Sequence, residues 1–373
     1  MLLPLEYHFP VASVSAEHLD NLLYSGYFRT GNYLMRTRLL YFNEEILNTL
    51  HIRFQLQNHQ FSKRLRKLLK RNNEHFTFTI QPCAITLEKE NLYKAHRKRF
   101  KGNASLSLTS YMSDNYELDV FNTMEINVYD KNKLVAFSFF DIGSKSIASI
   151  IGIFDQDYTA YSLGIYTMLL EIEYAKSKHF QYYYPGYVAY EPSQFNYKLR
   201  LSDNFEFLDW YSKKWLPFDN RYKKKRVNDF FSEKLATAKK WLDKNNIPNQ
   251  EMIYPFFFMG SMYPSTDCVK GIRHLLIQNH QFKNVYFLVE FHPEKMQLVL
   301  CGVVTYKYSF FPDIENKEDY TNNKWNKPLL YLNPTVTINN EEELKSGYDF
   351  LQAIVQKYLQ TLENPDEPAE FIF

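Results

Sequence analysis

The chain is poor in cysteine and glycine and carries almost no net charge. Its 373 residues include 3 Cys and 11 Gly, and 44 basic side chains nearly balance 42 acidic ones. The cysteines, Cys83, Cys268 and Cys301, are far apart and form no CxxC pair, which argues against a zinc ribbon, an iron–sulfur site or a disulfide framework. We therefore predict no bound metal and no cofactor. Any nucleic-acid site must be a local patch, because the overall charge provides no attraction.

Long apolar segments are absent too. No uncharged apolar run reaches the roughly 20 residues that a membrane span requires. The start, Met1–Pro10, has a short apolar run without a basic region before it, so no signal peptide is predicted. Together with the dispersed cysteines, this pattern predicts a cytoplasmic protein with no membrane partner.

Aromatic residues are abundant, and the most regular pattern is in Ile147–Tyr187. Ile147–Phe154 is apolar and β-branched, as a buried strand is, and Ser162 is placed to cap a helix that follows. That helix has one apolar face, formed by Ile165, Met168, Leu169, Ile172 and Ala175. Gln181–Tyr184 reads as the next strand. Such a unit directs the loop after the first strand and the N–H groups of the helix to one sheet edge, where open sheets bind ligands.

The segment before this unit alternates with period two. Met124–Tyr129 and Leu134–Asp141 read as strands of an antiparallel meander that leads into the strand at Ile147. A meander followed by strand, helix and strand describes the centre of a GNAT acyltransferase-like fold. The predicted class is therefore α/β (α+β), with a GNAT-like mixed sheet, flanking helices and an additional C-terminal α/β unit. The helices predicted in that last unit are Val269–Asn279 and Glu341–Leu362.

Composition divides the chain into four segments. They are an N-terminal segment over 1–85, a GNAT-like core over 86–212, a basic helical linker over 213–249 and a C-terminal α/β domain of unknown role over 250–373.

The clearest charge feature is the stretch 61–72, FSKRLRKLLKRN. Phe61, Leu65, Leu68 and Leu69 form one helical face, and no acidic residue interrupts the rest. Such a helix can bind RNA, lie on a membrane surface or simply be solvated. We favour contacts with nucleic-acid phosphates, since each neutralised phosphate adds affinity through counterion release. The candidate phosphate-binding residues, which the family resemblance given below makes tRNA-binding, are Lys63, Arg64, Arg66, Lys67, Lys70 and Arg71.

A second cluster of arginines lies around the turn Gly31-Asn32. Arg29, Arg36 and Arg38 are close to it in sequence. They are either solvated charges beside a hairpin or an anion or carboxylate site, because arginine binds carboxylates in bidentate fashion. Arg29, Asn32, Arg36 and Arg38 are the candidate residues of this site, for which the family resemblance given next implies an aminoacyl or acceptor pocket.

The order of these motifs resembles the arginyl-tRNA–protein transferase family, including its bacterial leucyl-transferring branch. Gly26–Arg38 is similar to its G-[FY]-R-R-[ST]-G block, and Ser62–Asn72 to its S-R-S-x-R-R-x-x-K-R-N block. Phe154–Tyr166 is similar to its F-Y-D-P…S-L-G-x-[YF] block, and Tyr184–Tyr187 and Tyr197-Lys198 to its Y-x-G-Y and Y-K-x-R ends. The resemblance covers about residues 7–210. The family's cysteines near the N-terminus and after Arg38 are missing here, so their metal role does not carry over.

The resemblance implies transfer of arginine or leucine from a tRNA to the N-terminal amine of an acceptor protein or peptide, an N-degron type of modification. The ester is already activated, so the enzyme has to align the amine and remove a proton. Asp155 and Asp157 are the candidates for positioning or deprotonation, with a turn or cap role as the alternative. Backbone N–H groups around Ser162–Gly164 are candidates for an oxyanion site. The hydroxyls of Tyr187 and Tyr197 complete the candidate catalytic set.

Two other functions stay open. The first is an acyl-CoA-dependent N-acetyltransferase on the same fold. The loop Asp157–Gly164 counts against it, since this loop has one glycine and no basic residue to bind a pyrophosphate. The second is an inactive relative that binds RNA or protein, which the missing cysteines favour and the retained Asp155, Ser162 and Gly164 oppose.

Overall fold

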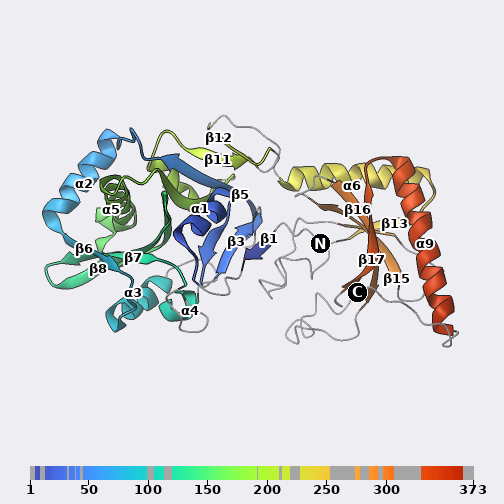
Figure 1. Ribbon diagram of the computed structural model, residues 1–373, viewed down its shortest axis with the longest axis horizontal. Helices are drawn as coiled ribbons and strands as arrows, with labels where there is room; N and C mark the ends of the chain where they lie inside the picture. The colour runs from blue at the N-terminus through green and yellow to red at the C-terminus, as the bar shows by residue number, and fades with distance from the viewer. Residues whose placement is uncertain are drawn as a thin grey trace. The chain divides into compact units, whose positions relative to one another are not determined.

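The computed structural model divides the chain into two compact units (Figure 1). The N-terminal unit comprises Leu5–Arg38 and Thr49–Lys223, and the C-terminal unit comprises Met1–Pro4, Leu39–Asn48 and Lys224–Phe373. The four segments predicted from composition remain a proposal for the functional division of the chain. The residues that the structure describes are 5–8, 13–31, 33–37, 39–42, 45–98, 105–112, 120–190, 192–209, 212–218, 227–252, 274–277, 285–292, 297–305 and 329–363.

The main sheet is mixed and nine-stranded within the described residues, in the order β12-β11-β5-β10-β9-β8-β7-β6, with β4 pairing with β5 off this path. All neighbours are antiparallel except β9 and β10, which are parallel. This mixed sheet with its flanking helices confirms the predicted fold class. The strands are β4 (Leu39–Phe42), β5 (Glu45–Gln55), β6 (Thr77–Pro82), β7 (Thr123–Asp130), β8 (Lys133–Ile142), β9 (Ser146–Phe154), β10 (Tyr182–Ala189), β11 (Glu206–Asp209) and β12 (Lys214–Pro217).

Helices cover both faces of this sheet. On one face α5 (Leu163–Ser177) connects β9 to β10 and packs with α2 (Lys63–His75) in the largest apolar cluster. On the other face α1 (Ala16–Tyr24) packs over Ala148 and Tyr184, beside a small sheet of β1 (Leu5–His8), β3 (Tyr33–Thr37) and β2 (Phe28–Thr30). Next to it, α3 (Leu87–Arg97) and α4 (Leu108–Met112) cover Phe137 and Phe139 of β8.

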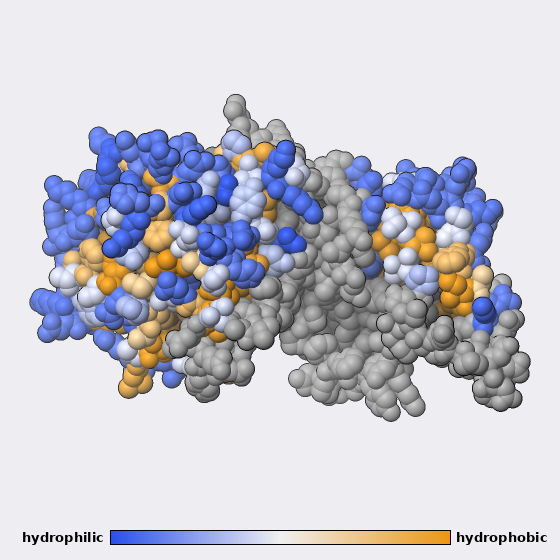
Figure 2. Space-filling model, viewed as in Figure 1, coloured by the Kyte–Doolittle hydropathy of each residue, from blue (hydrophilic) through white to orange (hydrophobic). Residues whose placement is uncertain are grey.

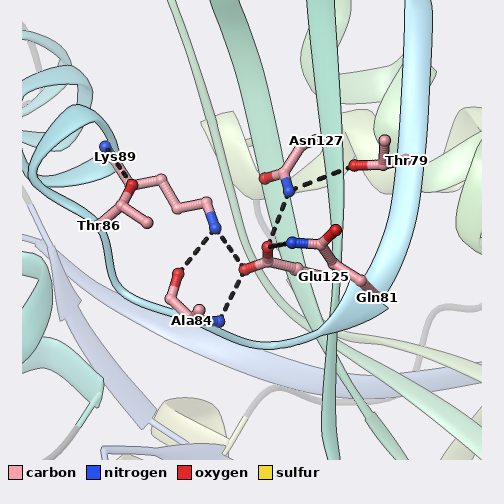
Figure 3. A network of polar contacts seen from close by, with 7 residues as sticks. All are labelled: Thr79, Gln81, Ala84, Thr86, Lys89, Glu125 and Asn127. Carbon is pink, nitrogen blue, oxygen red and sulfur yellow. Dashed lines mark hydrogen bonds and ion pairs between the residues drawn. The ribbon is translucent and has the colours of Figure 1, made fainter.

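A buried polar network ties α3 to β7 (Figure 3). Lys89 donates to the Glu125 carboxylate at 2.5 Å and to the Ala84 carbonyl at 2.7 Å. Glu125 also accepts from the Ala84 N–H and from the side-chain amides of Gln81 and Asn127. Because both charged groups are buried, each depends on the other and on these dipoles for stabilisation.

The C-terminal unit has its own sheet of five antiparallel strands, in the order β13-β14-β15-β16-β17 among the described residues. Two helices, α6 (Val227–Lys244) and α9 (Glu341–Glu363), pack with it. The predicted helix Val269–Asn279 is wrong, since His274–Ile277 is β14 and the rest lies outside the described residues. The other strands are β13 (Asn249–Met252), β15 (Val285–His292), β16 (Gln297–Thr305) and β17 (Leu329–Ile338).

Candidate active site

The two parallel strands of the main sheet separate part-way along their length. β9 and β10 pair only through Tyr182–Tyr184 and Ser146–Ala148, after which β10 shifts register and continues along β5 alone. Pro185 lacks an N–H for a ladder, and Gly186 has a φ of +93°, a conformation that L side chains rarely adopt. Within the described residues, the β9 edge beyond Ala148 therefore has no strand partner on this side. We call this opening the strand split.

A small pocket lies at the strand split, with a volume of about 20 Å³. Its walls come from seven elements that are spread over the sequence, α1, β2, β5, β8, β9, β10 and β12. Most of the wall is apolar, and the polar contributions come from Arg29, His51, Asp141 and Ser149. The lining residues are Leu19, Leu23, Tyr27, Phe28, Arg29, His51, Ile52, Asp141, Ala148, Ser149, Ile150, Tyr184, Gly186 and Trp215.

Arg29 and Asp141 form a buried ion pair in the wall of this pocket. Arg29 Nη1 lies 2.8 Å from Asp141 Oδ1 and 2.7 Å from Thr123 Oγ1, and Arg29 Nε donates to the Gly31 carbonyl at 2.7 Å. Burial raises the pKa of Asp141, and Arg29 and Thr123 oppose that shift. Arg29 is thus placed at the predicted pocket, but most of its donors are already used within the protein.

Of the other three residues of the predicted pocket, Arg36 is among the described residues. Arg36 is half-buried, donates to the Ser25 carbonyl at 3.2 Å and stacks over the Tyr27 ring at 4.8 Å. Asn32 and Arg38 lie outside the described residues. Their part in the pocket stays a prediction.

A second buried carboxyl faces the strand split from α5. Glu171 is fully buried, its Oε2 accepts from the Tyr183 hydroxyl at 2.6 Å, and its Oε1 has no hydrogen-bond partner among the described residues. Burial raises the pKa of Glu171 to about 7, and the nearby hydroxyls of Ser138, Tyr183 and Ser149 oppose the shift. Ser149 also lines the pocket, so it connects the pocket to Glu171.

The predicted tyrosines belong to this group. Burial raises the pKa of Tyr197 to about 12, with the Glu171 carboxyl adding to the shift, so its hydroxyl stays protonated at neutral pH. Tyr197 is nevertheless 39% exposed, as expected for a side chain at the rim of an opening. Tyr187 lies beside Phe28, at 5.0 Å between ring centroids, and its carbonyl accepts from Lys198 Nζ at 3.0 Å. Desolvation lowers the pKa of Lys198 to about 8.

The structure places the remaining catalytic candidates beside α2 instead. Asp155 accepts from the Asp157 N–H at 3.1 Å, as the cap of a short 3-10 helix, η1 (Gln156–Tyr161), and its Oδ2 pairs with Lys133 at 2.7 Å. Ser162 precedes α5 as predicted, but it has a left-handed backbone, with a φ of 52°, and its side chain caps nothing. The contacts of Asp155 fit the alternative turn role, and its role in chemistry stays a prediction.

Sequence reasoning did not single out Glu171, Asp141 or Lys198 as site residues. A signal for Glu171 was present: it is a carboxylate inside the apolar face of the predicted helix, between Met168 and Ile172. The signal for Asp141 was weaker, because an acid at the end of a strand is usually solvated. Lys198 belongs to the Tyr197-Lys198 pair that is similar to the family's Y-K-x-R block, but the sequence alone indicates no role for it.

The basic helix forms as predicted, as α2. Leu65 and Leu69 are buried, and all six basic side chains are exposed. Of the six, only Lys70 has an acid within 4.0 Å among the described residues, Glu74 at 3.9 Å. Figure 2 shows the hydrophilic side chains gathered over this end of the unit. Asn72 and Arg71 donate to the Tyr161 and Ala160 carbonyls, which fixes α2 beside η1 and the start of α5.

Metal ligands are not grouped in the part of the chain that the structure describes. No cluster of three or more His, Cys, Asp or Glu side chains is present there. Cys83 is half-buried and burial raises the pKa of its thiol to about 12, which disfavours the thiolate that metals bind. The absence of a metal stays a prediction. No described helix is long and apolar enough to cross a membrane.

Comparison with known proteins agrees with the resemblance found in the sequence. Residues 88–207 match the family model of the arginine-tRNA-protein transferase C terminus. These residues hold β7–β10, α5 and most of the strand split. The match supports the predicted resemblance to the arginyl/leucyl-tRNA–protein transferases and the predicted class of activity, aminoacyl transfer.

Relatives and solved structures extend the comparison. Aspartate/glutamate leucyltransferase of Leptospira interrogans is 28% identical over 197 residues, which are 51% of this chain and 75% of the relative. The Campylobacter jejuni protein of that name is 27% identical over 213 residues, 54% of this chain and 83% of the relative. Among solved structures, the C-terminal domain of a putative lysylphosphatidylglycerol synthetase from Agrobacterium fabrum is similar over 46% of this chain and 60% of that structure. The sequence identity is 13% and the TM-score is 0.32.

Proposed function

We propose that this chain transfers leucine from leucyl-tRNA to the N-terminal amine of proteins that begin with aspartate or glutamate. The strand split carries this proposal, because it holds an open backbone edge, a pocket and two buried carboxyls. The choice of leucine over arginine is supported by the relatives, which are named aspartate/glutamate leucyltransferases. Such a transfer creates a new N-terminal residue, as in an N-degron, and the cytoplasm is the proposed compartment.

The chemistry assigned to the strand split is aminolysis of an ester. The N–C bond forms as the acceptor amine attacks the carbonyl, and the C–O bond to the terminal ribose breaks. The amine gives up one proton and the ribose oxygen takes one, so no cofactor is consumed. In this proposal Ser149 passes the proton from the amine to Glu171, whose pKa of about 7 suits an acceptor at neutral pH. Tyr187, Tyr197 and Lys198 align the reactants.

The N-terminus of α5 has a separate part in this proposal. The N–H groups around Ser162–Gly164 begin a helix, where the backbone attracts negative charge. They lie beside α2, to which η1 is hydrogen-bonded through Asn72. We assign them to a phosphate of the tRNA, with Asp155 and Asp157 shaping the loop.

A transfer assay tests the substrate choice. The full chain is mixed with labelled leucyl-tRNA, arginyl-tRNA or acetyl-CoA, and with peptides that begin with Asp, Glu or Ala, or with an acetylated N-terminus. We expect label from leucyl-tRNA alone, on Asp and Glu peptides alone. Label from arginyl-tRNA would show that the transferred amino acid is arginine and not leucine. Label from acetyl-CoA would favour the acetyltransferase alternative.

The contribution of α2 is tested by removing charge. Replacing Lys63, Lys67 and Lys70 by Gln is expected to weaken tRNA binding and to lower the slope of log K against log salt by about 2 to 3, because each lost phosphate contact removes close to one released counterion. Filter binding at several salt concentrations measures the slope. A matched variant with Lys178, Lys213 and Lys214 changed to Gln loses the same charge from exposed positions elsewhere. Equal slopes for the two variants would contradict the role of α2.

A further inference from the structure

One polar atom in the wall of the pocket is left without a partner. Asp141 is fully buried, and its Oδ1 accepts from Arg29 at 2.8 Å and from Thr123 at 2.7 Å. Its Oδ2 has no hydrogen-bond partner among the described residues. A buried carboxylate oxygen without a donor is costly, so the site is built for a donor that arrives from outside.

The pocket limits what that donor is. At about 20 Å³ it has room for one group of the size of a water molecule. A primary ammonium has this size, and it offers three N–H donors. Asp141 is the one acidic side chain in this lining, so it is the group that a cation in the pocket would bind.

We infer that Asp141 Oδ2 binds the α-ammonium group of the amino acid carried by the tRNA, inside the pocket at the strand split. This inference rests on the proposed function, since it takes the donor substrate from it. Arg29 and Thr123 hold Oδ1 of this pocket-lining carboxylate, so Oδ2 is the oxygen that is left to accept from an incoming donor.

The choice between the two amines of the reaction follows from their chemistry. The acceptor amine must be neutral to attack, and a buried carboxylate would stabilise its ammonium form and slow the reaction. The α-amine of the donor does not react, so binding it as an ammonium costs nothing in the chemical step. Asp141 therefore suits the donor amine, and the proton-accepting Glu171 suits the acceptor.

A consequence is selection for a free α-amine on the donor. An N-acylated aminoacyl-tRNA has no ammonium, and its amide would leave Asp141 Oδ2 unpaired and bring a larger group into a pocket with little room. The enzyme would then reject acylated donors at the binding step. It would do so without a residue dedicated to the acyl group.

Small analogues of the donor test this inference without tRNA. Binding of L-leucinamide to the full wild-type chain is compared, by calorimetry, with binding of 4-methylpentanamide, which lacks only the α-amine, and of N-acetyl-L-leucinamide. We expect leucinamide to bind about 10- to 100-fold more tightly than either, as for a hydrogen bond between charged groups. Equal affinities, or no detectable leucinamide binding at tens of millimolar, would overturn the inference.

Two variants test whether Asp141 causes the preference for leucinamide over the analogues that lack a free α-amine. Asp141→Asn should remove the preference for leucinamide, whereas the exposed Asp203→Asn should keep it. If Asp141→Asn fails to fold, because Arg29 loses its partner, the comparison of ligands on the wild type still decides. The result is separate from the transfer assay: transfer from leucyl-tRNA with equal binding of the three amides would leave the proposed function intact and remove only this ammonium site.

Discussion

Glu171→Gln is expected to lower the rate of aminoacyl transfer by about 10²–10⁴, the range attributed to general acid–base catalysis. Gln keeps the shape of the side chain and can still accept from the Tyr183 hydroxyl, which lies 2.6 Å from Glu171 Oε2. It cannot accept a proton from Ser149 at neutral pH. Single-turnover transfer from leucyl-tRNA measures the effect, and tRNA affinity should be unchanged because α2 is untouched.

The pH dependence of this variant separates chemistry from structure. As a proton acceptor Glu171 must be ionised, so the wild-type rate should rise with pH through about 7, the pKa of this carboxyl. This rise of the rate with pH, the acidic limb of the pH profile, should be absent in Glu171→Gln. Glu173→Gln, an exposed acid two residues along α5, is the matched control and should keep both the rate and the limb. If the wild-type rate does not change between roughly pH 6 and pH 8, on either side of that pKa, Glu171 is not the proton acceptor.

Stability should change with pH in the opposite direction. The folded pKa of Glu171, about 7, is raised above the ordinary value of 4.5 because burial disfavours the charged form. Its contribution is therefore fully present below about pH 4.5 and is lost as the pH rises through 7, a change of about 3 kcal/mol. Glu171→Gln should flatten this dependence in urea unfolding. A merely structural carboxyl would give this stability effect without the limb in the rate.

The local elements of the site could be predicted because their signals are local. The period-two strands β7 and β8, the apolar strand β9, the helix α5 and the basic helix α2 all follow from spacing within a few residues. The short apolar run at His274–Ile277 was ambiguous by the same rule, since four residues do not distinguish a strand from part of a helix.

The strand split could not be predicted, because it depends on pairing between distant segments. β10 leaves β9 to continue along β5, whose residues pair with it from more than 120 positions away in sequence. Asp141 becomes a pocket residue only because Arg29, from β2, reaches it across the fold. The predicted strand ends at Tyr184, whereas β10 continues to Ala189 and changes partner at Pro185-Gly186.

Lys89→Met is expected to destabilise the N-terminal unit by about 3–5 kcal/mol, the cost of breaking a buried ion pair by removing one partner. Glu125 is 0% exposed and would keep its charge without the ammonium that lies 2.5 Å away (Figure 3). Its remaining contacts, the Ala84 N–H and the Gln81 and Asn127 amides, are neutral dipoles and compensate only in part. Urea unfolding at constant pH measures the loss.

The second charge decides whether the ion pair is the cause. Adding Glu125→Gln to Lys89→Met removes the unpaired carboxylate, so the double variant should be more stable than Lys89→Met alone, because the large penalty comes from an uncompensated charge. Lys244→Met in the C-terminal unit breaks an exposed pair with Glu341, at 2.9 Å, and should change stability by less than about 1 kcal/mol. Since the chain has two compact units, two unfolding transitions are expected, and Lys89→Met should move only that of the N-terminal unit. A double variant less stable than Lys89→Met would mean that the lysine acts through packing of its alkyl chain and not through its charge.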